Sequence, residues 1–209
     1  MASTASATEP QQKRSWETRR KLLDATVECV AEYGYAGASM DRIVERAGVS
    51  RGAQGHHFPT KNLLIQAAFA HMLDGMIEDL RRQTEMIRER HSDPATVFRH
   101  LWNVYFSGRL FAVTTEFIAA SRTDEDLRQA LIPVSERFHQ QVDDCFYILN
   151  RGSDYEDPQL RMAVNLTMSL LRGMGVQTYL YDHPDHYREM LDFWLSILGR
   201  VLEPGRQDA

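Results

Sequence analysis

The sequence predicts an all-α protein of about nine helices, with a small amino-terminal head and a larger carboxy-terminal body. Apolar residues recur at three- and four-residue spacing along most of the 209 residues, as on one face of a helix. Prolines and capping residues separate these runs, and none alternates between apolar and polar residues as a surface strand does. No internal repeat or glycine-rich phosphate loop interrupts them, which argues against α/β enzyme folds.

The expected elements follow in chain order. Residues 1–13 are small and polar and predict a disordered tail. A first helix should end at Gly34, and Thr60 should cap a long helix that ends near Arg90. Further helices are expected at about residues 94–107, 109–121, 124–150, 158–181 and 184–202, three of them opening with a proline.

The stretch 39–61 has the spacing of a helix, a tight turn and a second helix. Ala47 is small, so two helix backbones can cross closely there. Gly48 can take the left-handed conformation that ends a helix, and Ser50 offers a hydroxyl to the open N–H groups of the next. Arg51 therefore begins a short exposed helix whose first turn would meet base edges in DNA.

This stretch resembles the amino-terminal pattern of the TetR (tetracycline-repressor-like) family, approximately T-x-x-x-I-A-x-x-A-G-V-S-x-G-x-L-Y-x-H-F-x-x-K. The resemblance covers roughly residues 15–70 and departs from the pattern at Gln54 and Gly55, where the family has leucine and tyrosine. The matching residues are Ser39, Ile43, Ala47, Gly48, Val49, Ser50, Gly52, His57, Phe58 and Lys61.

The resemblance implies a transcriptional regulator, most often a repressor, that binds a pseudo-palindromic operator as a homodimer. A small, largely hydrophobic effector would release it. Residues 14–62 would form the DNA-binding domain and residues 63–209 the ligand-binding and dimerisation domain.

Arg51 and Gln54 are the residues expected to contact base edges, because arginine pairs with guanine and glutamine with adenine in the major groove. Gly55 weakens the recognition helix by roughly 1 kcal/mol relative to alanine, which predicts a head that orders on DNA. A packing role is the alternative for His57. The residues expected to contact the DNA backbone are Ser39, His56, His57 and Lys61.

Charge is unevenly distributed along the chain. The net charge of −5 would by itself argue against a nucleic-acid partner. Residues 11–62 nevertheless hold nine lysines and arginines and only six acids. A basic head can orient a protein on a polyanion, although an ordinary charged surface is the alternative. We therefore expect a double-stranded DNA partner.

Composition predicts a cytoplasmic protein with no membrane partner. No run of about 18 apolar residues is present, and the amino-terminal segment is too polar for a secretory signal. Cys29 and Cys145 lie in apolar helical patterns and are expected to be reduced core thiols. No cofactor, metal ion or catalytic residue is expected.

Polar and aromatic residues among apolar helical neighbours predict an effector pocket in the body. Glu116 and Arg172 each have mostly apolar or small residues one turn away on both sides, as a largely hydrophobic ligand with one or two polar groups requires. A structural role, including a pair between the two, is the alternative. The candidate effector contacts are Trp102, Tyr105, Phe106, Glu116, Met168 and Arg172.

The last two helices predict a homodimer through residues 158–202. The final helix is apolar on two faces, and a second copy is the simplest partner for the face that its own core does not need. Burial within one chain is the alternative. In the helix before the final one, the residues at near-heptad spacing are Leu160, Val164, Thr167, Leu171 and Met174. In the final helix, one stripe comprises Tyr187, Met190, Leu191, Trp194, Leu195 and Leu198, and the other comprises Phe193, Ile197 and Val201.

Two other function classes stay open. His183 and His186 lie near Asp182 and Asp185, but both histidines are at a helix start and Asp185 is more simply its cap, so an enzymatic metal site is disfavoured. A helical protein-binding adaptor, or a DNA-binding protein without an effector, is the other alternative. Electrophoretic retardation of the DNA that flanks the protein's own gene separates these classes.

Overall fold

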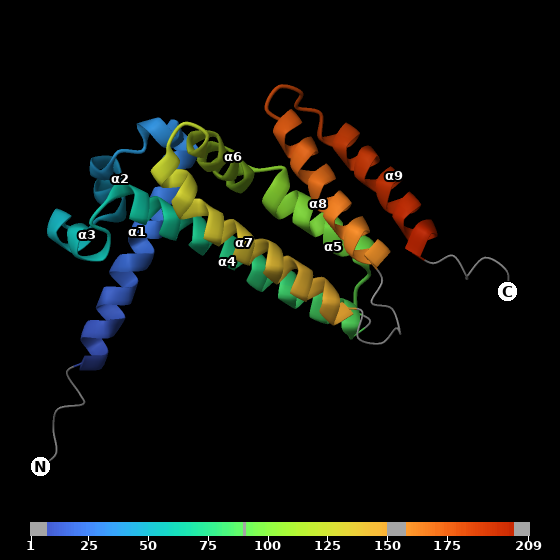
Figure 1. Ribbon diagram of the computed structural model, residues 1–209, viewed down its shortest axis with the longest axis horizontal. Coiled ribbons are helices and arrows are strands. Elements are labelled where there is room, and N and C mark those ends of the chain that lie inside the picture. Colours follow the sequence, from blue (N-terminus) through green and yellow to red (C-terminus); the bar gives the residue numbers. More distant parts are fainter. Residues whose placement is uncertain (1–7, 90, 150–157, 203–209) are drawn as a thin grey trace, which may run out of the picture. The chain divides into compact units, whose positions relative to one another are not determined.

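The computed structural model describes residues 8–89, 91–149 and 158–202 (Figure 1). All regular elements in these ranges are helices, which confirms the predicted all-α fold. The elements are α1 (Thr8–Gly37), α2 (Met40–Ala47), α3 (Arg51–His57), α4 (Lys61–Arg88), α5 (Pro94–Leu101), the π-helix η1 (Trp102–Phe106), α6 (Arg109–Ser121), α7 (Glu125–Leu149), α8 (Pro158–Gln177) and α9 (Pro184–Leu202).

Capping chemistry sets several of these boundaries where the sequence predicted them. The Thr60 hydroxyl accepts a hydrogen bond from Leu63 N at 3.3 Å and so caps α4. Asp93 accepts one from Thr96 N at 3.0 Å, with Pro94 in the first turn of α5. Two details differ from the prediction: α8 ends at Gln177, and the segment expected as one helix over 94–107 changes to π-helical geometry at Trp102.

The amino-terminal helix departs from the sequence expectation at both ends. It begins at Thr8, so residues 8–13 are helical where a disordered tail was expected, and residues 1–7 lie outside the described ranges. Gly34 interrupts the helix with a φ of 71° and a ψ of 171°, as its predicted role requires, but one more turn extends the element to Gly37. This backbone conformation is open almost only to glycine.

The chain packs as two compact units. Unit 1 holds the described residues up to Gly75 together with Ala112–Arg137, and unit 2 holds Met76–Phe111 and the described residues from Phe138 onward. The expected boundary after residue 62 therefore falls inside unit 1. The helices α4, α6 and α7 each contribute residues to both units.

Unit 1 has its own apolar core. The rings of Phe69 and Phe117 meet edge to face with their centroids 5.6 Å apart, which joins α4 to α6. Helix α1 adds Cys29, a buried free thiol, as predicted. Fully buried side chains of this core include Leu22, Thr26, Ile43, Leu64, Ile65, Phe117 and Leu127.

Unit 2 is built around α5, η1, α8 and α9. The Trp102 ring lies 5.7 Å from that of Tyr187, and Trp194 Nε1 donates a hydrogen bond to Thr167 Oγ1 at 2.9 Å. The heptad-like stripe of α8 is buried within this chain. For those residues the alternative of burial within one chain therefore holds, and they are not available for a dimer contact. The buried residues of the stripe are Val164, Thr167, Leu171 and Met174, and the side chain of Leu160 lies outside what the structure describes.

None of the helices in the described ranges is long and apolar enough to cross a membrane.

Candidate DNA interface and effector site

The helix-turn-helix forms as its capping residues predicted. Ser39 Oγ accepts a hydrogen bond from Arg42 N at 3.3 Å and opens α2. Gly48 closes α2 with a φ of 62°, in the left-handed region. Ser50 Oγ then accepts from Ala53 N at 3.2 Å and opens α3. Ser39 is thus a helix cap, and any contact it makes with a phosphate has to share that role.

Helix α3 is well exposed and carries Arg51 in its first turn. No residue of α3 is buried, and the Arg51 side chain is 75% exposed. Its guanidinium lies 2.5 Å from Asp41 Oδ1 of α2. An exposed ion pair of this kind contributes little stability, so the guanidinium can exchange it for a base edge.

Gln54 is less free than its sequence position suggested. Its side-chain nitrogen donates to the carbonyl oxygen of Phe58 at 2.5 Å and so helps to close α3. Reading an adenine would require breaking this bond. Gly55, by contrast, has no atom within 4 Å of the position where a Cβ would stand, so a larger residue fits there.

The two histidines at the end of α3 differ in environment. His56 is exposed, whereas His57 is half-buried. Burial lowers the pKa of His57, and the nearby His56 and Arg19 lower it further. An imidazole that is neutral at neutral pH is a weak partner for phosphate, so this arrangement favours the packing alternative for His57.

Lys61 is held inside the protein. Its Nζ donates to the Tyr35 carbonyl oxygen at 3.0 Å and lies 4.5 Å from the centre of the Tyr35 ring. Burial lowers the pKa of Lys61, although the nearby Asp124 raises it. To contact a phosphate as expected, Lys61 would have to give up its hydrogen bond to the Tyr35 carbonyl oxygen in α1.

The amino-terminal half of α1 forms an exposed basic surface that no sequence motif marked. Lys13, Arg14 and Lys21 are all exposed, and Trp16 is 60% exposed beneath the guanidinium of Arg20. Farther along, Arg19 covers Phe58, which follows α3, at 4.7 Å. Arg19 thus links α1 to the residue that follows the recognition helix, and the exposed cations of α1 add positive charge to unit 1.

Glu116 is placed differently from the prediction. It lies in α6 within unit 1 and is exposed, and its Oε2 accepts a hydrogen bond from Tyr35 N at 2.8 Å. A Cβ at Gly34 would stand 3.2 Å from the same oxygen. The interruption of α1 leaves the Tyr35 N–H without a helical acceptor, and the Glu116 carboxylate accepts its hydrogen bond. The alternative of a pair between Glu116 and Arg172 is therefore not supported.

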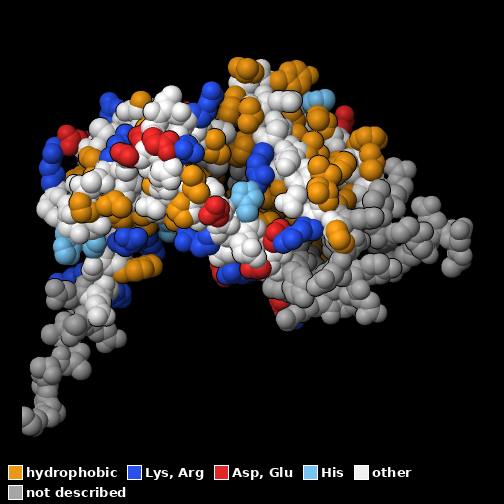
Figure 2. Space-filling model, viewed as in Figure 1, with side chains coloured by type: hydrophobic (Ala, Val, Ile, Leu, Met, Phe, Trp, Pro, Cys, Tyr) orange, Lys and Arg blue, Asp and Glu red, His pale blue; other side chains and the backbone are white. Residues whose placement is uncertain are grey.

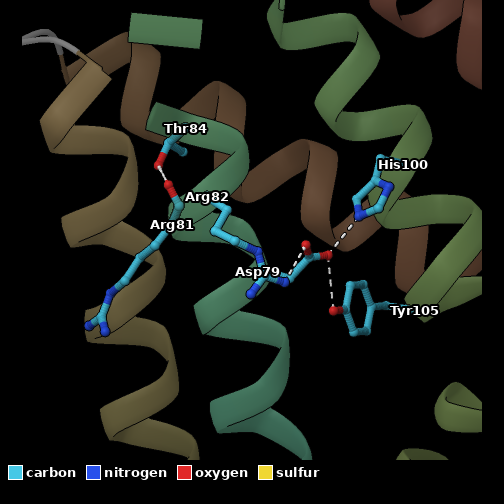
Figure 3. Close-up of polar contacts among 6 residues, drawn as sticks. All are labelled: Asp79, Arg81, Arg82, Thr84, His100 and Tyr105. Atoms are coloured by element: carbon cyan, nitrogen blue, oxygen red, sulfur yellow. Dashed lines mark hydrogen bonds and ion pairs between the residues drawn. The ribbon is translucent and has the colours of Figure 1, made fainter. Parts of the chain in front are cut away.

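A buried acid in unit 2 joins α4 to α5 and η1 (Figure 3). The Asp79 Oδ2 atom lies 2.6 Å from His100 Nε2 and accepts a hydrogen bond from the Tyr105 hydroxyl at 3.0 Å. Arg82 donates to Oδ1 at 3.1 Å. Burial alone would raise the pKa of Asp79, but these bonds from His100, Arg82 and Tyr105 outweigh it and lower the pKa. Burial and the bond to Asp79 raise the pKa of Tyr105 to about 12.

The π-helix concentrates the aromatic candidates. The Ser107 N–H bonds back to the Trp102 carbonyl oxygen at 2.9 Å, which closes the wider turn. Trp102 and Phe106 are buried, and the Phe106 ring lies 5.6 Å from that of Phe111. Single π-helical turns are frequent at functional sites. No sequence pattern signalled this one.

Helix α8 approaches η1 through a glycine. A Cβ at Gly175 would stand 2.5 Å from the Phe106 carbonyl oxygen, so only glycine permits this approach. Met168 and Arg172 lie seven and three residues earlier, on the same face of α8. Met168 is buried and Arg172 partly buried. Five of the six candidate effector residues therefore belong to unit 2, and Glu116 does not.

An apolar surface extends over α8 and α9, which lie side by side (Figures 1 and 2). Met162 is 59%, Leu166 51% and Phe193 67% exposed. On the second apolar stripe of α9, Phe193 is exposed and Ile197 is half-buried, whereas the first stripe is largely buried through Tyr187, Leu191, Leu195 and Leu198. A groove in this surface is lined by Pro158, Met162, Ala163, Leu166, Trp194, Ile197 and Leu198.

The histidines near the start of α9 pack on an aromatic ring. The Tyr181 ring lies 4.1 Å from that of His183 and 5.6 Å from that of His186. Among the residues that the structure describes, no group of three histidines, cysteines or acids is gathered as metal ligands would be.

Three comparisons place this geometry among known proteins. Residues 22–68 match the family model described as bacterial regulatory proteins, tetR family. The chain is 28% identical over 196 residues to the HTH-type transcriptional regulator CymR of Pseudomonas putida, with 90% of this chain and 92% of that protein covered. It is 33% identical over 107 residues to the HTH-type transcriptional repressor AcnR of Corynebacterium glutamicum, with 41% and 56% covered.

The fold is shared with a solved structure. A TetR-family transcriptional regulator from Mesorhizobium loti matches with a TM-score of 0.69 at 19% identity, over 88% of this chain and 98% of that one.

Proposed function

Because this chain belongs to the tetR family of bacterial regulatory proteins, we propose that it is a repressor that binds a pseudo-palindromic operator as a homodimer. A small, largely hydrophobic effector bound by unit 2 releases it. The proposed site of action is the cytoplasm, where a bacterial regulator meets its operator.

One observation carries the DNA-binding part of this proposal. Helix α3 is capped at Ser50, has no buried residue and is led by Arg51, which pairs with the exposed acid Asp41. A recognition helix presents its amino-terminal residues to base edges in the major groove in this manner. Lys13, Arg14 and Lys21 of α1 add sequence-independent attraction to phosphates.

The DNA-binding proposal predicts different losses for two arginines. Arg51→Ala should weaken operator binding by about 1–3 kcal/mol and relax the base preference at one position of each half-site. Arg14→Ala is the matched control, because it removes an exposed cation outside α3. It should weaken operator and random DNA alike and reduce the salt slope by about one per subunit.

The measurement is electrophoretic retardation of the DNA that flanks the protein's own gene, with random DNA as competitor and at several salt concentrations. Equal losses on operator and random DNA for Arg51→Ala would refute its role in reading bases. Failure of the wild-type protein to retard any DNA would favour the adaptor alternative.

The homodimer is proposed through the exposed apolar surface of α8 and α9. Met162 and Leu166 are exposed and line the groove between α8 and α9, and Phe193 is exposed on α9. A self-complementary apolar surface is the usual basis of a two-fold dimer. Two recognition helices related by that axis can read half-sites about 34–36 Å apart. The dimer is what makes operator binding sensitive to the spacing of the two heads.

Phe193→Glu should therefore give a folded monomer by sedimentation, with operator binding lost. Phe193 is a better probe than Trp194, whose ring nitrogen bonds to Thr167 within the same chain. The matched control is Ile118→Glu, which changes a residue 54% exposed in α6 and should leave the dimer intact. A Phe193→Glu protein that still sediments as a dimer would move the interface elsewhere.

The effector part rests on the aromatic and polar residues of η1 and α8. Trp102, Tyr105 and Phe106 provide a large apolar surface with one hydroxyl, and Met168 and Arg172 lie on the α8 face that meets η1. The chain continues from η1 into α6, and α6 carries Glu116 to the backbone of Tyr35. We propose that effector binding at η1 changes operator affinity through this element as well as through α4.

A further inference from the structure

Arg172 of unit 2 has a charge that the described residues leave unbalanced. It is partly buried in α8, and no acid or other acceptor among the described residues forms an ion pair or hydrogen bond with it. Burial lowers the pKa of its guanidinium, and no neighbouring charge contributes. An arginine nevertheless keeps its proton at neutral pH, so a partly buried positive charge persists here.

Two residues one turn away from Arg172 on α8 are buried. Gly175, one turn after Arg172, lies against the Phe106 carbonyl oxygen, so this face of α8 meets the aromatic π-helix. Met168, one turn before Arg172, is 1% exposed. Side chains on a helix lean toward its amino terminus, so we expect the stem of Arg172 to run toward the turn that contains Met168.

The acid of unit 2 that borders η1 is already committed elsewhere. Asp79 is bonded to His100, Tyr105 and Arg82, so its two oxygens are occupied and its charge is matched by Arg82. Glu116, the one acid that the sequence pattern suggested as a partner of Arg172, bonds to Tyr35 in unit 1. A partly buried charge without an opposite charge nearby costs free energy, and a ligand that supplies the opposite charge would lower that cost.

We propose that the effector is an organic carboxylate with a largely apolar body, and that Arg172 binds its carboxylate while η1 contacts the body. This inference rests on the proposed function, because it names the ligand class of the same effector site. A guanidinium presents parallel N–H donors that match the two oxygens of a carboxylate. One arginine balances one negative charge, which favours a monocarboxylate over a phosphate dianion.

The experiment compares acids with their uncharged amides on the full-length protein. The probes are benzoate, 4-phenylbutyrate and decanoate, each matched with its primary amide, at constant ionic strength. Ligand binding to the native state raises the melting temperature, and titration of the shift gives Kd. At least one acid should bind the wild-type protein more tightly than its amide and release the operator.

The variants test whether Arg172 causes the preference. Arg172→Gln should weaken binding of that acid by about 10- to 150-fold and leave amide binding within a few fold. Arg172→Lys keeps the charge but loses the paired donors, so it should retain part of the preference. It also serves as the second variant if the glutamine protein fails to fold.

The outcomes are separable from those of the proposed function. Amides that bind as tightly as the acids, an acid preference that survives Arg172→Gln, or no binding by any acid would each overturn the inference. Operator retardation without ligand is scored independently. A protein that prefers acids but retards no DNA would refute the repressor proposal and support the carboxylate site. A protein that acids and amides release equally from DNA would support the repressor proposal and refute the carboxylate site.

Discussion

Glu116 in unit 1 and Arg172 in unit 2 have the same sequence signature and different surroundings. Each is a charged residue with mainly apolar or small neighbours one helical turn away. Glu116 is exposed and bonds to the backbone N–H of Tyr35 at 2.8 Å. Arg172 is partly buried and has no ion-pair partner among the residues that the structure describes.

The comparison shows that a charge in an apolar helical pattern does not by itself indicate a ligand. The interruption of α1 at Gly34 leaves an N–H that needs an acceptor, and Glu116 supplies it. No comparable backbone group explains Arg172. Glu116 has a partner within the fold, whereas Arg172 has none among the described residues, so Arg172 is the better candidate for binding an effector.

A glycine lies close to each of the two charges, for different reasons. Gly34 is required by its positive φ, whereas Gly175 is helical and is required by the close approach of α8 to η1. We therefore expect a methyl group added at Gly175 to have the largest effect on stability of the substitutions considered below.

Gly175→Ala should lower the free energy of unfolding by about 1–3 kcal/mol, because its Cβ would overlap both the Phe106 carbonyl and the Phe111 ring. Gly173→Ala is the matched control in the same helix, since no atom lies within 4 Å of its Cβ position. It should gain about 0.5–1 kcal/mol from helix propensity. Urea denaturation of both variants measures the difference.

Gly175→Ala should also weaken binding of the preferred acid, because α8 carries Arg172 and has to move away from η1. If the two alanine variants have equal stability and bind the acid equally, the contact between α8 and η1 does not shape the effector site.

Much of the fold could be predicted because its boundaries depend on local chemistry. The Thr60 and Asp93 caps, the left-handed Gly48 and the prolines that open three helices act within a few residues of their partners. Periodicity then separated the buried stripe of α9 from its exposed one. The π-helix was missed because a change from i+4 to i+5 bonding leaves the apolar spacing almost unchanged.

The candidate site was less predictable because its contacts join distant parts of the chain. The bond from Tyr35 to Glu116 spans 81 residues, and that from Tyr105 to Asp79 spans 26. Gln54 and Lys61 were assigned to DNA from their residue type, but each donates to a backbone carbonyl of the protein. Helix periodicity gives the face on which a side chain lies and not the acceptor that it finds there.

The smallest expected effect comes from Glu116, and it tests the other half of the comparison. Glu116→Ala removes the acceptor of the Tyr35 N–H at an exposed site, where water can replace it, so the free energy of unfolding should fall by only about 0.5–1.5 kcal/mol. Operator affinity without effector should fall as well, because the corner of α1 that leads into α2 loses its support.

Glu116→Gln is the matched control, because its amide oxygen can still accept the hydrogen bond while the charge is gone. It should recover most of the stability and operator affinity lost in the alanine variant, as judged by denaturation and retardation on the same protein samples. A glutamine variant as weak as alanine would mean that the charge matters more than the bond. Normal operator affinity in Glu116→Ala, together with an altered response to the acid probes, would return Glu116 to the effector site and remove its contrast with Arg172.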